Sequence, residues 1–233
     1  MSVPRPIDHT VVIVLAAGAG SRFGGPVHKL LTELDGAPIA ERAIESAVRS
    51  GVGPVVVVAG AVDLGPVVAR VMTRLAHRPS SELGARPNDD ARATPLVIDN
   101  PMWADGQATS LQVGIRTARE LGATAVVVGL ADMPFVDPDT WRRVAASAAP
   151  LAVATYGGQR RNPVRLAAEI WPDLPTTGDE GARSLLRRSP DRVEEVPCSG
   201  SPDDIDTQED LASWQSRSST SSPSISPSTR RGR

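Results

Sequence analysis

The sequence is poor in the residues that build disulfide scaffolds and thiolate metal sites. Its 233 residues include a single cysteine, Cys198, which excludes an intramolecular disulfide and a cysteine-rich metal centre. We interpret Cys198 as a small structural residue. The three histidines, His9, His28 and His77, lack the spacing of metal ligands. Aromatic residues make up only 3% of the chain, so valine, isoleucine, leucine and alanine must fill the core.

Long apolar runs and a strong charge imbalance are also missing. Every apolar run is far shorter than the roughly 20 residues that a membrane-spanning helix needs. The N-terminus, MSVPRPIDHT, lacks the apolar centre of a secretory signal. The net charge of −2 and the pI of about 5.9 give no reason to expect a nucleic acid as partner. We therefore predict a soluble, cytoplasmic protein with neither a membrane nor a nucleic acid as partner.

Short, nearly all-apolar segments alternate with amphipathic ones along the chain. The apolar segments are typical of strands covered on both faces of a parallel sheet, and they are Thr10–Ala16, Pro54–Ala59, Pro95–Ile98, Ala125–Leu130 and Leu151–Thr155. The amphipathic segments predict helices, and they are Ile39–Arg49, Leu64–Leu75, Ser110–Leu121 and Pro138–Ala146. This alternation predicts an α/β fold with a doubly wound, mostly parallel sheet between two layers of helices.

Composition divides the chain into one domain and two flanking segments. Residues 1–9 form an N-terminal extension, and residues 10–215 form the domain. Within it, the polar stretch 77–94 predicts a long, mobile surface loop. Residues 216–233 are rich in serine and proline and nearly devoid of apolar side chains, so we predict a disordered tail.

A glycine-rich loop follows the first predicted strand, in the stretch IVLAAGAGSRFGGPVHKLL. It fails the dinucleotide-binding fingerprint because Phe23 stands where the third glycine belongs, and it fails the Walker pattern because Pro26 replaces the lysine. A third pattern remains, L-A-A-G-x-G-x-R-x-G followed by a lysine. Glycines let main-chain N–H groups approach a phosphate, and Arg22 and Lys29 would neutralise the charge of a departing pyrophosphate. The alternative is an ordinary glycine-rich turn with two unrelated cations.

The segment from Leu15 to Gly24, together with Lys29, resembles the signature loop of MobA-like nucleotidyltransferases. These α/β enzymes transfer a nucleoside monophosphate from a nucleoside triphosphate to an acceptor phosphate. The resemblance implies a Rossmann-like nucleotidyltransferase fold for residues 10–215, with Arg22 and Lys29 as catalytic residues. It implies nucleotide contacts for Leu15, Ala16, Ala17, Gly18, Gly20, Gly24 and Lys29.

Two aspartates are candidates for a Mg²⁺ site. Asp132 follows the apolar segment AVVVGLA, and ligands of open α/β sheets bind at the carboxyl ends of the strands. A hard oxygen ligand facing a triphosphate suggests Mg²⁺. The alternative role for Asp132, capping the next helix, fits Asp137 better. Asp206 follows from the resemblance, since the family ends in D-x-D-T-x-E-D-L with an aspartate at the metal. Acids before a helix can also compensate its dipole, and Thr207 with Asp210 forms a near-capping box.

Three further segments resemble the molybdenum-cofactor cytidylyltransferases, a branch of the same family. NPMWADGQATSL resembles N-P-x-W-x-x-G-x-x-S-L and implies nucleotide contacts for Asn100 and Ser110. GDEGAR matches G-D-x-G-A-R, and RRNPV lies where the branch carries G-H-P-V. The implied acceptor-binding residues are Asn162, Pro163, Asp179 and Glu180. Arg161 and Asn162 replace the Gly-His pair of the branch, which weakens the acceptor assignment, and the neighbouring arginines Arg160, Arg161 and Arg165 fit a solvated edge equally well.

The resemblance implies a Mg²⁺-dependent transfer of CMP from CTP to molybdopterin or molybdenum cofactor, with release of pyrophosphate. Ala17 favours CTP, because guanylyl relatives often carry L-A-G-G. An apo molybdenum hydroxylase is a candidate protein partner. Alternatives with the same chemistry are a phospholactate guanylyltransferase and a sugar- or polyol-phosphate nucleotidyltransferase. A non-enzymatic molybdenum-cofactor carrier and a dinucleotide oxidoreductase are the alternatives of other classes, and Phe23 counts against the latter.

Overall fold

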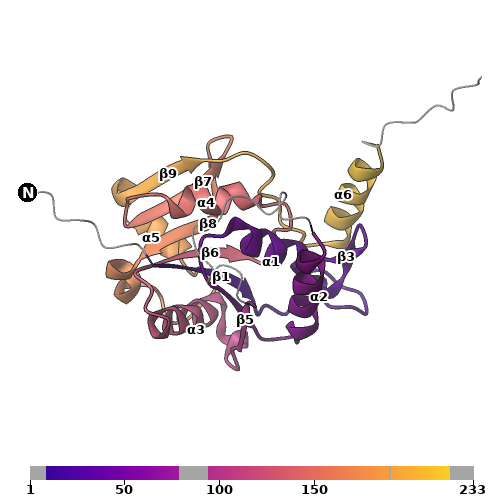
Figure 1. Cartoon of the computed structure of the whole chain (residues 1–233), viewed down its shortest axis with the longest axis horizontal. Coiled ribbons are helices and arrows are strands. Elements are labelled where there is room, and N and C mark those ends of the chain that lie inside the picture. The colour runs from indigo at the N-terminus through magenta and orange to yellow at the C-terminus, as the bar shows by residue number, and fades with distance from the viewer. Residues whose placement is uncertain (1–8, 79–93, 189, 221–233) are drawn as a thin grey trace, which may run out of the picture.

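The computed structural model describes residues 9–78, 94–188 and 190–220 (Figure 1). Most of the predicted N-terminal extension and of the predicted loop 77–94 lies outside these residues. Helix α6, Gln208–Thr220, continues past the expected start of the tail at residue 216, so the chain has no structural break at that boundary. The rest of the predicted tail, 221–233, lies outside the described residues.

The centre of the fold is a seven-stranded sheet in the order β5-β4-β1-β6-β8-β7-β9. Every pairing between neighbouring strands is parallel except those of β8, which is antiparallel to both β6 and β7. The strands are β1 Thr10–Ala16, β4 Val55–Ala59, β5 Leu96–Asp99, β6 Ala125–Leu130, β7 Leu151–Tyr156, β8 Gln159–Ala167 and β9 Val193–Pro197, and β2 Glu33–Leu34 and β3 Ala37–Pro38 form a separate hairpin. The prediction of a doubly wound, mostly parallel sheet is confirmed.

Helices cover the sheet on both faces. Apart from α6, they are α1 Ile39–Ser50, α2 Gly65–Ala76, α3 Gln107–Glu120, α4 Pro138–Ala145 and the short α5 Arg183–Arg188, with 3₁₀ turns at η1 Lys29–Leu31, η4 Trp103–Asp105, η5 Ala168–Asp173 and η6 Pro190–Arg192. Side chains of α1, α2 and α4 pack on one face, and those of α3 and α5 pack on the other. No helix among the described residues is long and apolar enough to cross a membrane.

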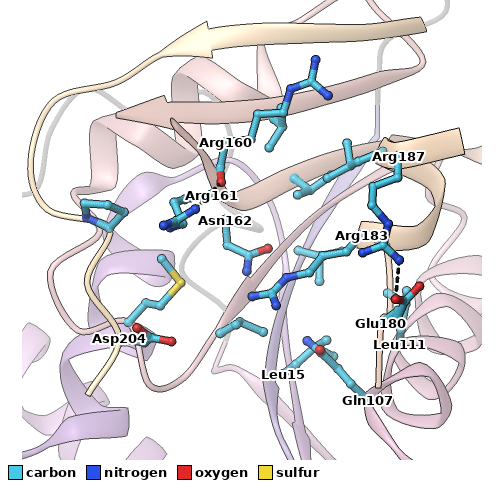
Figure 2. Close-up of a pocket in the computed structure, with 18 of the residues that line it drawn as sticks. Leu15, Gln107, Leu111, Arg160, Arg161, Asn162, Glu180, Arg183, Arg187 and Asp204 are labelled. Atoms are coloured by element: carbon cyan, nitrogen blue, oxygen red, sulfur yellow. Dashed lines mark hydrogen bonds and ion pairs between the residues drawn. The ribbon is translucent and has the colours of Figure 1, made fainter. Parts of the chain in front are cut away.

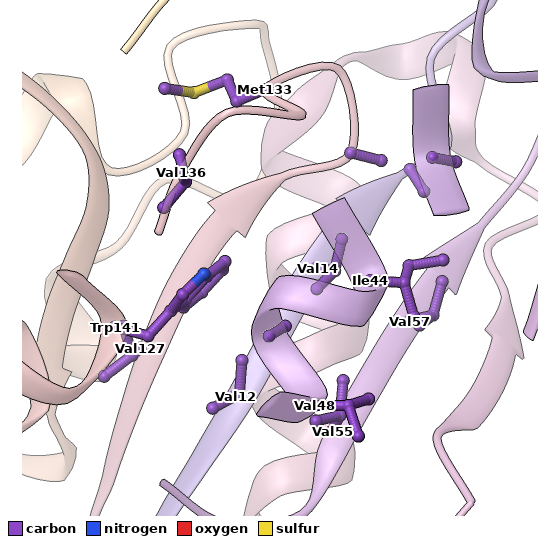
Figure 3. Close-up of a cluster of buried hydrophobic side chains, with 14 of the residues drawn as sticks. Val12, Val14, Ile44, Val48, Val55, Val57, Val127, Met133, Val136 and Trp141 are labelled. Carbon is purple, nitrogen blue, oxygen red and sulfur yellow. The ribbon is translucent and has the colours of Figure 1, made fainter. Parts of the chain in front are cut away.

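The first strand shows why the chain folds into three layers. Successive side chains of a strand point to opposite faces. Val12 and Val14 therefore join the cluster under α1, α2 and α4, where Ile44 and Trp141 meet them (Figure 3), while Ile13 joins the cluster on the α3 side. A strand buried on both faces has to be apolar throughout, which is the pattern seen in the sequence.

Two strands of the sheet carry no signal that the sequence analysis recognised. Strand β8 holds several arginines, and its register with β7 shifts between Val153 and Ala154. One of these arginines, Arg165, is only 3% exposed, and its Nη1 donates to the Ala149 carbonyl at 2.7 Å. The expectation that Arg160, Arg161 and Arg165 form one solvated edge is therefore wrong for Arg165. Strand β9 is an edge strand whose side chains are mostly exposed, so it lacks the apolar signature of the others.

Candidate active site at the ends of β1 and β6

The strand order places a crevice between β1 and β6. Strands β4 and β5 lie on one side of β1, and β6, which follows them in the chain, lies on its other side. The strand order therefore reverses between β1 and β6, and ligands of open α/β sheets bind at such a reversal, outside the carboxyl ends of the strands. The glycine-rich loop follows β1, and Asp132 follows β6. The fold thus brings two of the predicted site segments to the same edge of the sheet.

The side chain of Phe23 anchors the glycine-rich loop in the apolar interior. This side chain is only 3% exposed and belongs to a small apolar cluster with Leu34, Ile39, Ile205 and Leu211. Gly20 has a φ of +63°, and a Cβ there would lie 3.0 Å from the Cβ of Lys29, so the loop crosses Lys29 at a distance that favours glycine. Phe23 thus provides the apolar contact of the loop with the domain.

Lys29 lies at the centre of the crevice between two carboxylates. Its Nζ donates to Oδ2 of Asp132 at 2.7 Å and to Oδ1 of Asp206 at 2.8 Å. The exposed Arg22 pairs with the same Asp206 through an Nη1–Oδ2 distance of 2.9 Å. The structure therefore brings together all four residues that the sequence analysis named as catalytic or metal-binding.

Burial and charge act in opposite directions on Lys29. Burial alone would lower the pKa of its ammonium group, but the charges and hydrogen bonds of Asp132 and Asp206 outweigh burial and raise this pKa. Lys29 is consequently a permanent cation at neutral pH. Nearby, burial together with the charges of Asp206 and Asp132 raises the pKa of the Asp204 carboxyl.

Hydrogen bonds at their main-chain groups hold the segments of the two aspartates in place. The Ile205 N–H donates to the Asp132 carbonyl at 3.0 Å, which ties the segment before α6 to the end of β6. Oδ2 of Asp210 accepts from the N–H groups of Asp206 and Thr207 at 3.1 and 2.8 Å, and the Asp210 N–H donates to Oγ1 of Thr207. The hydrogen bond from the Thr207 hydroxyl is the largest of the effects that lower the pKa of Asp210, and the main-chain N–H of Thr207 adds to it. The predicted capping box at α6 is present, and it orients Asp206.

The donor set of Asp132 and Asp206 fits a divalent cation. Oδ1 of Asp132 is buried and has no hydrogen-bond partner among the described residues. The capping role goes to Asp137, whose carboxylate accepts from the Asp139 N–H at 2.7 Å, so Asp132 is not used for that purpose. The described part of the chain has no cluster of three or more acidic, histidine or cysteine ligands. Two carboxylates suit Mg²⁺, which takes most of its oxygen ligands from phosphates and water.

His28 is a site residue that the sequence analysis missed. Its Nε2 lies 3.0 Å from the Gly18 carbonyl, and its Nδ1 accepts from the Leu30 N–H at 3.2 Å, so the neutral tautomer with the proton on Nε2 satisfies both contacts. Burial, reinforced by the charge of Lys29, lowers the pKa of the imidazole. His28 therefore links the glycine-rich loop to the turn that carries Lys29. Only its position one residue before Lys29 could have suggested this role.

Two cavities open at this edge of the sheet and share Leu15 as a common wall. The smaller, of about 360 Å³, is lined by the loop and the charged cluster, namely Leu15, Ala16, Gly18, Gly20, Arg22, Lys29, Asp132, Asp179 and Asp206 among others. The larger, of about 860 Å³, contains Asn162 and Glu180 (Figure 2). The neighbours Asp179 and Glu180 thus line different cavities.

Several predicted contact residues do not line either of these cavities. Ala17 is 4% exposed, and Gly24 presents its carbonyl to Nε2 of Gln208 at 3.4 Å. Pro163 is buried in β8 after a cis peptide bond. These three residues are therefore not placed at the surface of either cavity.

Asn100 and Ser110 form an internal polar joint. They are 2% and 3% exposed, and the Asn100 Nδ2 donates to the hydroxyls of Thr109 and Ser110 at 2.9 Å each. The neighbouring Ala108 N–H, at the start of α3, donates to the Gly178 carbonyl at 2.9 Å. The predicted nucleotide contacts of Asn100 and Ser110 therefore find no support in this arrangement, in which both side chains hold the loop before α3.

Comparisons with known proteins identify the family of the chain. The MobA-like NTP transferase domain matches residues 12–193. The chain is 30% identical to the purine catabolism protein PucB of Bacillus subtilis over 87% of this chain and 94% of that protein. It is 29% identical to nicotine blue oxidoreductase of Paenarthrobacter nicotinovorans over 85% and 93%, and 26% identical to the molybdenum cofactor guanylyltransferase of Rhodobacter capsulatus over 91% and 97%.

Solved structures share the fold. A nucleotidyl transferase from Methanothermobacter thermautotroptrophicus superimposes with a TM-score of 0.67 at 22% identity, over 92% of this chain and 100% of that one. A protein of Mycobacterium tuberculosis H37Rv in complex with manganese superimposes with a TM-score of 0.64 at 21% identity, over 89% and 98%. At these identities the likeness concerns the fold alone.

Proposed function

The chain belongs to the MobA-like NTP transferase family, and from this premise we propose that it is a Mg²⁺-dependent cytidylyltransferase acting on a molybdopterin-type acceptor. That the protein is a transferase of the nucleotidyltransferase type follows from the family and the fold. The proposal adds the donor CTP, the metal and the acceptor. The observation that carries it is the cluster in which Lys29 contacts both Asp132 and Asp206 inside a cavity walled by the glycine-rich loop.

The proposed reaction is an in-line displacement at the α-phosphorus of CTP. An oxygen of the acceptor phosphate forms the new bond to this phosphorus, the bond to the β-phosphate breaks, and pyrophosphate leaves with the electron pair. No covalent intermediate with the protein is needed, so the protein contributes position and charge. Main-chain N–H groups between Ala16 and Gly24 bind the triphosphate in this proposal.

Each charged residue has a distinct role in this reaction. Arg22, exposed at the rim, binds phosphate oxygens with its planar fork, and the buried Lys29 balances the charge that develops on the leaving pyrophosphate. Asp132 and Asp206 would hold Mg²⁺. When bound, Mg²⁺ would supply positive charge at the phosphate oxygens. Members of this type of enzyme usually depend on divalent metals, which agrees with the orphaned Oδ1 of Asp132.

The choice of base and acceptor is supported by resemblance. Ala17 in the L-A-A-G segment favours CTP over GTP, and a relative is named for molybdenum cofactor guanylyl transfer. In the proposal the acceptor occupies the larger cavity, with Asn162 and Glu180 in its wall and Asp179 at the border with the nucleotide. A molybdenum hydroxylase that lacks its cofactor would receive the product.

A two-way panel tests the proposal. CTP, GTP, ATP and UTP are each offered with molybdopterin, molybdenum cofactor, phospholactate and a sugar phosphate, and pyrophosphate release is measured with and without Mg²⁺. CTP with a molybdopterin-type acceptor should give the highest rate. A higher rate with phospholactate or a sugar phosphate would assign that compound as the acceptor instead. Tight pterin binding without turnover of any nucleotide would identify the protein as a carrier.

Because one relative is named nicotine blue oxidoreductase, oxidoreductase activity is measured in the same experiment. The chain is incubated with NADH or NADPH and nicotine blue, and absorbance at the nicotinamide band is followed. We expect no oxidation of the dinucleotide, because Phe23 occupies the position of the third glycine and is buried under the loop. Dinucleotide oxidation without any pyrophosphate release would refute the transferase proposal.

A further inference from the structure

Arginines gather around the larger cavity, above an apolar floor. Four of them line it, Arg160 and Arg161 from β8 and Arg183 and Arg187 from α5. The floor consists of side chains of the sheet and the flanking helices, among them Leu111, Val128, Leu130, Val153 and Val164. A cavity with an apolar base and a cationic wall suits a ligand with an apolar face and an anionic end.

Two of the four arginines are neutralised by carboxylates. Arg160 pairs with Glu195 through an Nε–Oε1 distance of 2.8 Å, and Arg187 pairs with Glu180. The other two, Arg161 and Arg183, have no carboxylate partner in the part of the chain that the structure describes. Arg161 makes one contact, from Nη1 to the Arg160 carbonyl at 3.0 Å, which leaves its charge uncompensated.

Both unpaired arginines line the cavity. Figure 2 shows Arg183 reaching from α5 toward the carboxamide of Asn162, while Arg161 extends from β8 on the other side and Arg160 turns away. A guanidinium group presents a planar fork that matches two oxygens of a phosphate. Asp204 is a carboxylate in the same cavity, and it lies apart from Arg183 in this view.

We propose that Arg161 and Arg183 form an anion clamp that binds the acceptor, and that this acceptor is a phosphomonoester whose body packs on the apolar floor. The inference rests on the proposed function, since it assigns the larger cavity to the acceptor. Arg161 stands where the cytidylyltransferase branch resembled by the sequence carries glycine, whereas Arg183 is the arginine of the shared G-D-x-G-A-R segment. Arg161 is therefore the part of the clamp that distinguishes this chain from that branch. The clamp selects for negative charge, and the floor selects for an apolar face.

Phenyl phosphate is the probe for the clamp, because it combines a phosphomonoester with a flat apolar ring. Its dissociation constant is measured by calorimetry for the wild-type chain and for Arg161→Gln, Arg183→Gln and Arg160→Gln, in the presence of Mg²⁺ and a saturating α,β-methylene analogue of CTP. Phenol and inorganic phosphate are titrated in parallel. Arg160→Gln is the matched control, since its arginine lies next to Arg161 but is already paired with Glu195.

The clamp predicts that Arg161→Gln and Arg183→Gln each weaken phenyl phosphate binding about tenfold or more, as expected for one charged hydrogen-bonded contact. Arg160→Gln should change it less than about twofold by the same reasoning. Phenol and inorganic phosphate should each bind more weakly than phenyl phosphate. Equal weakening in all three variants, or no binding of phenyl phosphate by the wild-type chain, would overturn the clamp.

Titration of the CTP analogue by itself separates this inference from the proposed function. If the analogue does not bind while the arginine variants still discriminate for phenyl phosphate, the proposed function fails and the clamp stands. If the analogue binds equally to all variants and phenyl phosphate does not discriminate among them, the clamp fails and the proposed function stands. Circular dichroism of each variant verifies that the fold is retained.

Discussion

The ammonium nitrogen of Lys29 lies 2.7 Å from Oδ2 of Asp132. The two residues come from the turn after the glycine-rich loop and from the end of β6, and both side chains are largely withdrawn from solvent. A cation held at this point stands next to the cavity in which the triphosphate is proposed to bind. The same contact keeps the carboxylate turned toward the site.

Replacing Lys29 by alanine should cripple turnover. Loss of one preorganised charge contact costs about 3 kcal/mol of transition-state stabilisation, on the order of a hundredfold in rate. Pyrophosphate release under saturating substrates measures the effect, with Lys29→Arg as the variant that keeps the charge. Since Asp132 and Asp206 would lose their shared cation, thermal unfolding is recorded alongside. A rate near that of the wild type in Lys29→Ala would remove this residue from the mechanism.

Replacing Asp132 by asparagine should abolish the Mg²⁺-dependent rate while the fold is kept. Asparagine has nearly the same shape but carries no charge to hold the cation, so we expect a loss of about a hundredfold or more. Titration of pyrophosphate release with Mg²⁺ and direct binding of Mn²⁺ measure it. The control is Asp137→Ala at the N-cap of α4, which should leave activity intact and lower the free energy of unfolding by about 1 kcal/mol.

The free energy of unfolding should fall in mild acid because of His28. Burial lowers the pKa of its imidazole from the ordinary value of 6.5, so below pH 6.5 the unfolded chain binds a proton before the folded chain does. The stabilisation is complete above pH 6.5 and is lost as the pH falls through the lowered pKa. Urea unfolding at a series of pH values measures this dependence.

Glutamine is the matched replacement for His28. Its amide offers one donor and one acceptor in place of the two imidazole nitrogens that contact the Gly18 carbonyl and the Leu30 N–H, but it does not titrate. The pH dependence of unfolding between 7.5 and 5.5 should therefore be smaller in His28→Gln. An identical pH dependence in both proteins would show that His28 is not the responsible group.

Truncation of Phe23 should loosen the loop without touching its polar groups. Deleting a buried aromatic side chain costs about 3 kcal/mol or more, and the Phe23 ring packs between the hairpin and the segment around α6. We expect Phe23→Ala to lower the midpoint of urea unfolding and to weaken binding of the CTP analogue, whereas phenyl phosphate binding is retained. The urea midpoint and the nucleotide affinity of Phe23→Leu should lie between those of the wild type and those of Phe23→Ala. Unchanged nucleotide affinity in Phe23→Ala would mean that the loop is held by other contacts.

Local sequence patterns were sufficient for most of the fold. An all-apolar strand such as β1 is recognisable because both of its faces are buried, and the α1 helix shows its apolar stripe with Gly51 at its end in a left-handed conformation. Strand β8 escaped recognition because it carries arginines where a buried strand is expected to be apolar. The sequence does not reveal that the Nη1 of the buried Arg165 donates to the Ala149 carbonyl.

The candidate site was likewise predictable from the sequence only in part. The sequence by itself determined which chemical groups follow which strand, because the glycine-rich loop and Asp132 adjoin β1 and β6 directly. Only the tertiary structure decided which of these groups meet. The hydrogen bond from Ile205 to the Asp132 carbonyl brings Asp206 to Lys29, and packing of the loop before α3 turns Asn100 inward. Contacts between distant segments depend on how whole elements pack, and this information is not contained in the periodicity of any one segment.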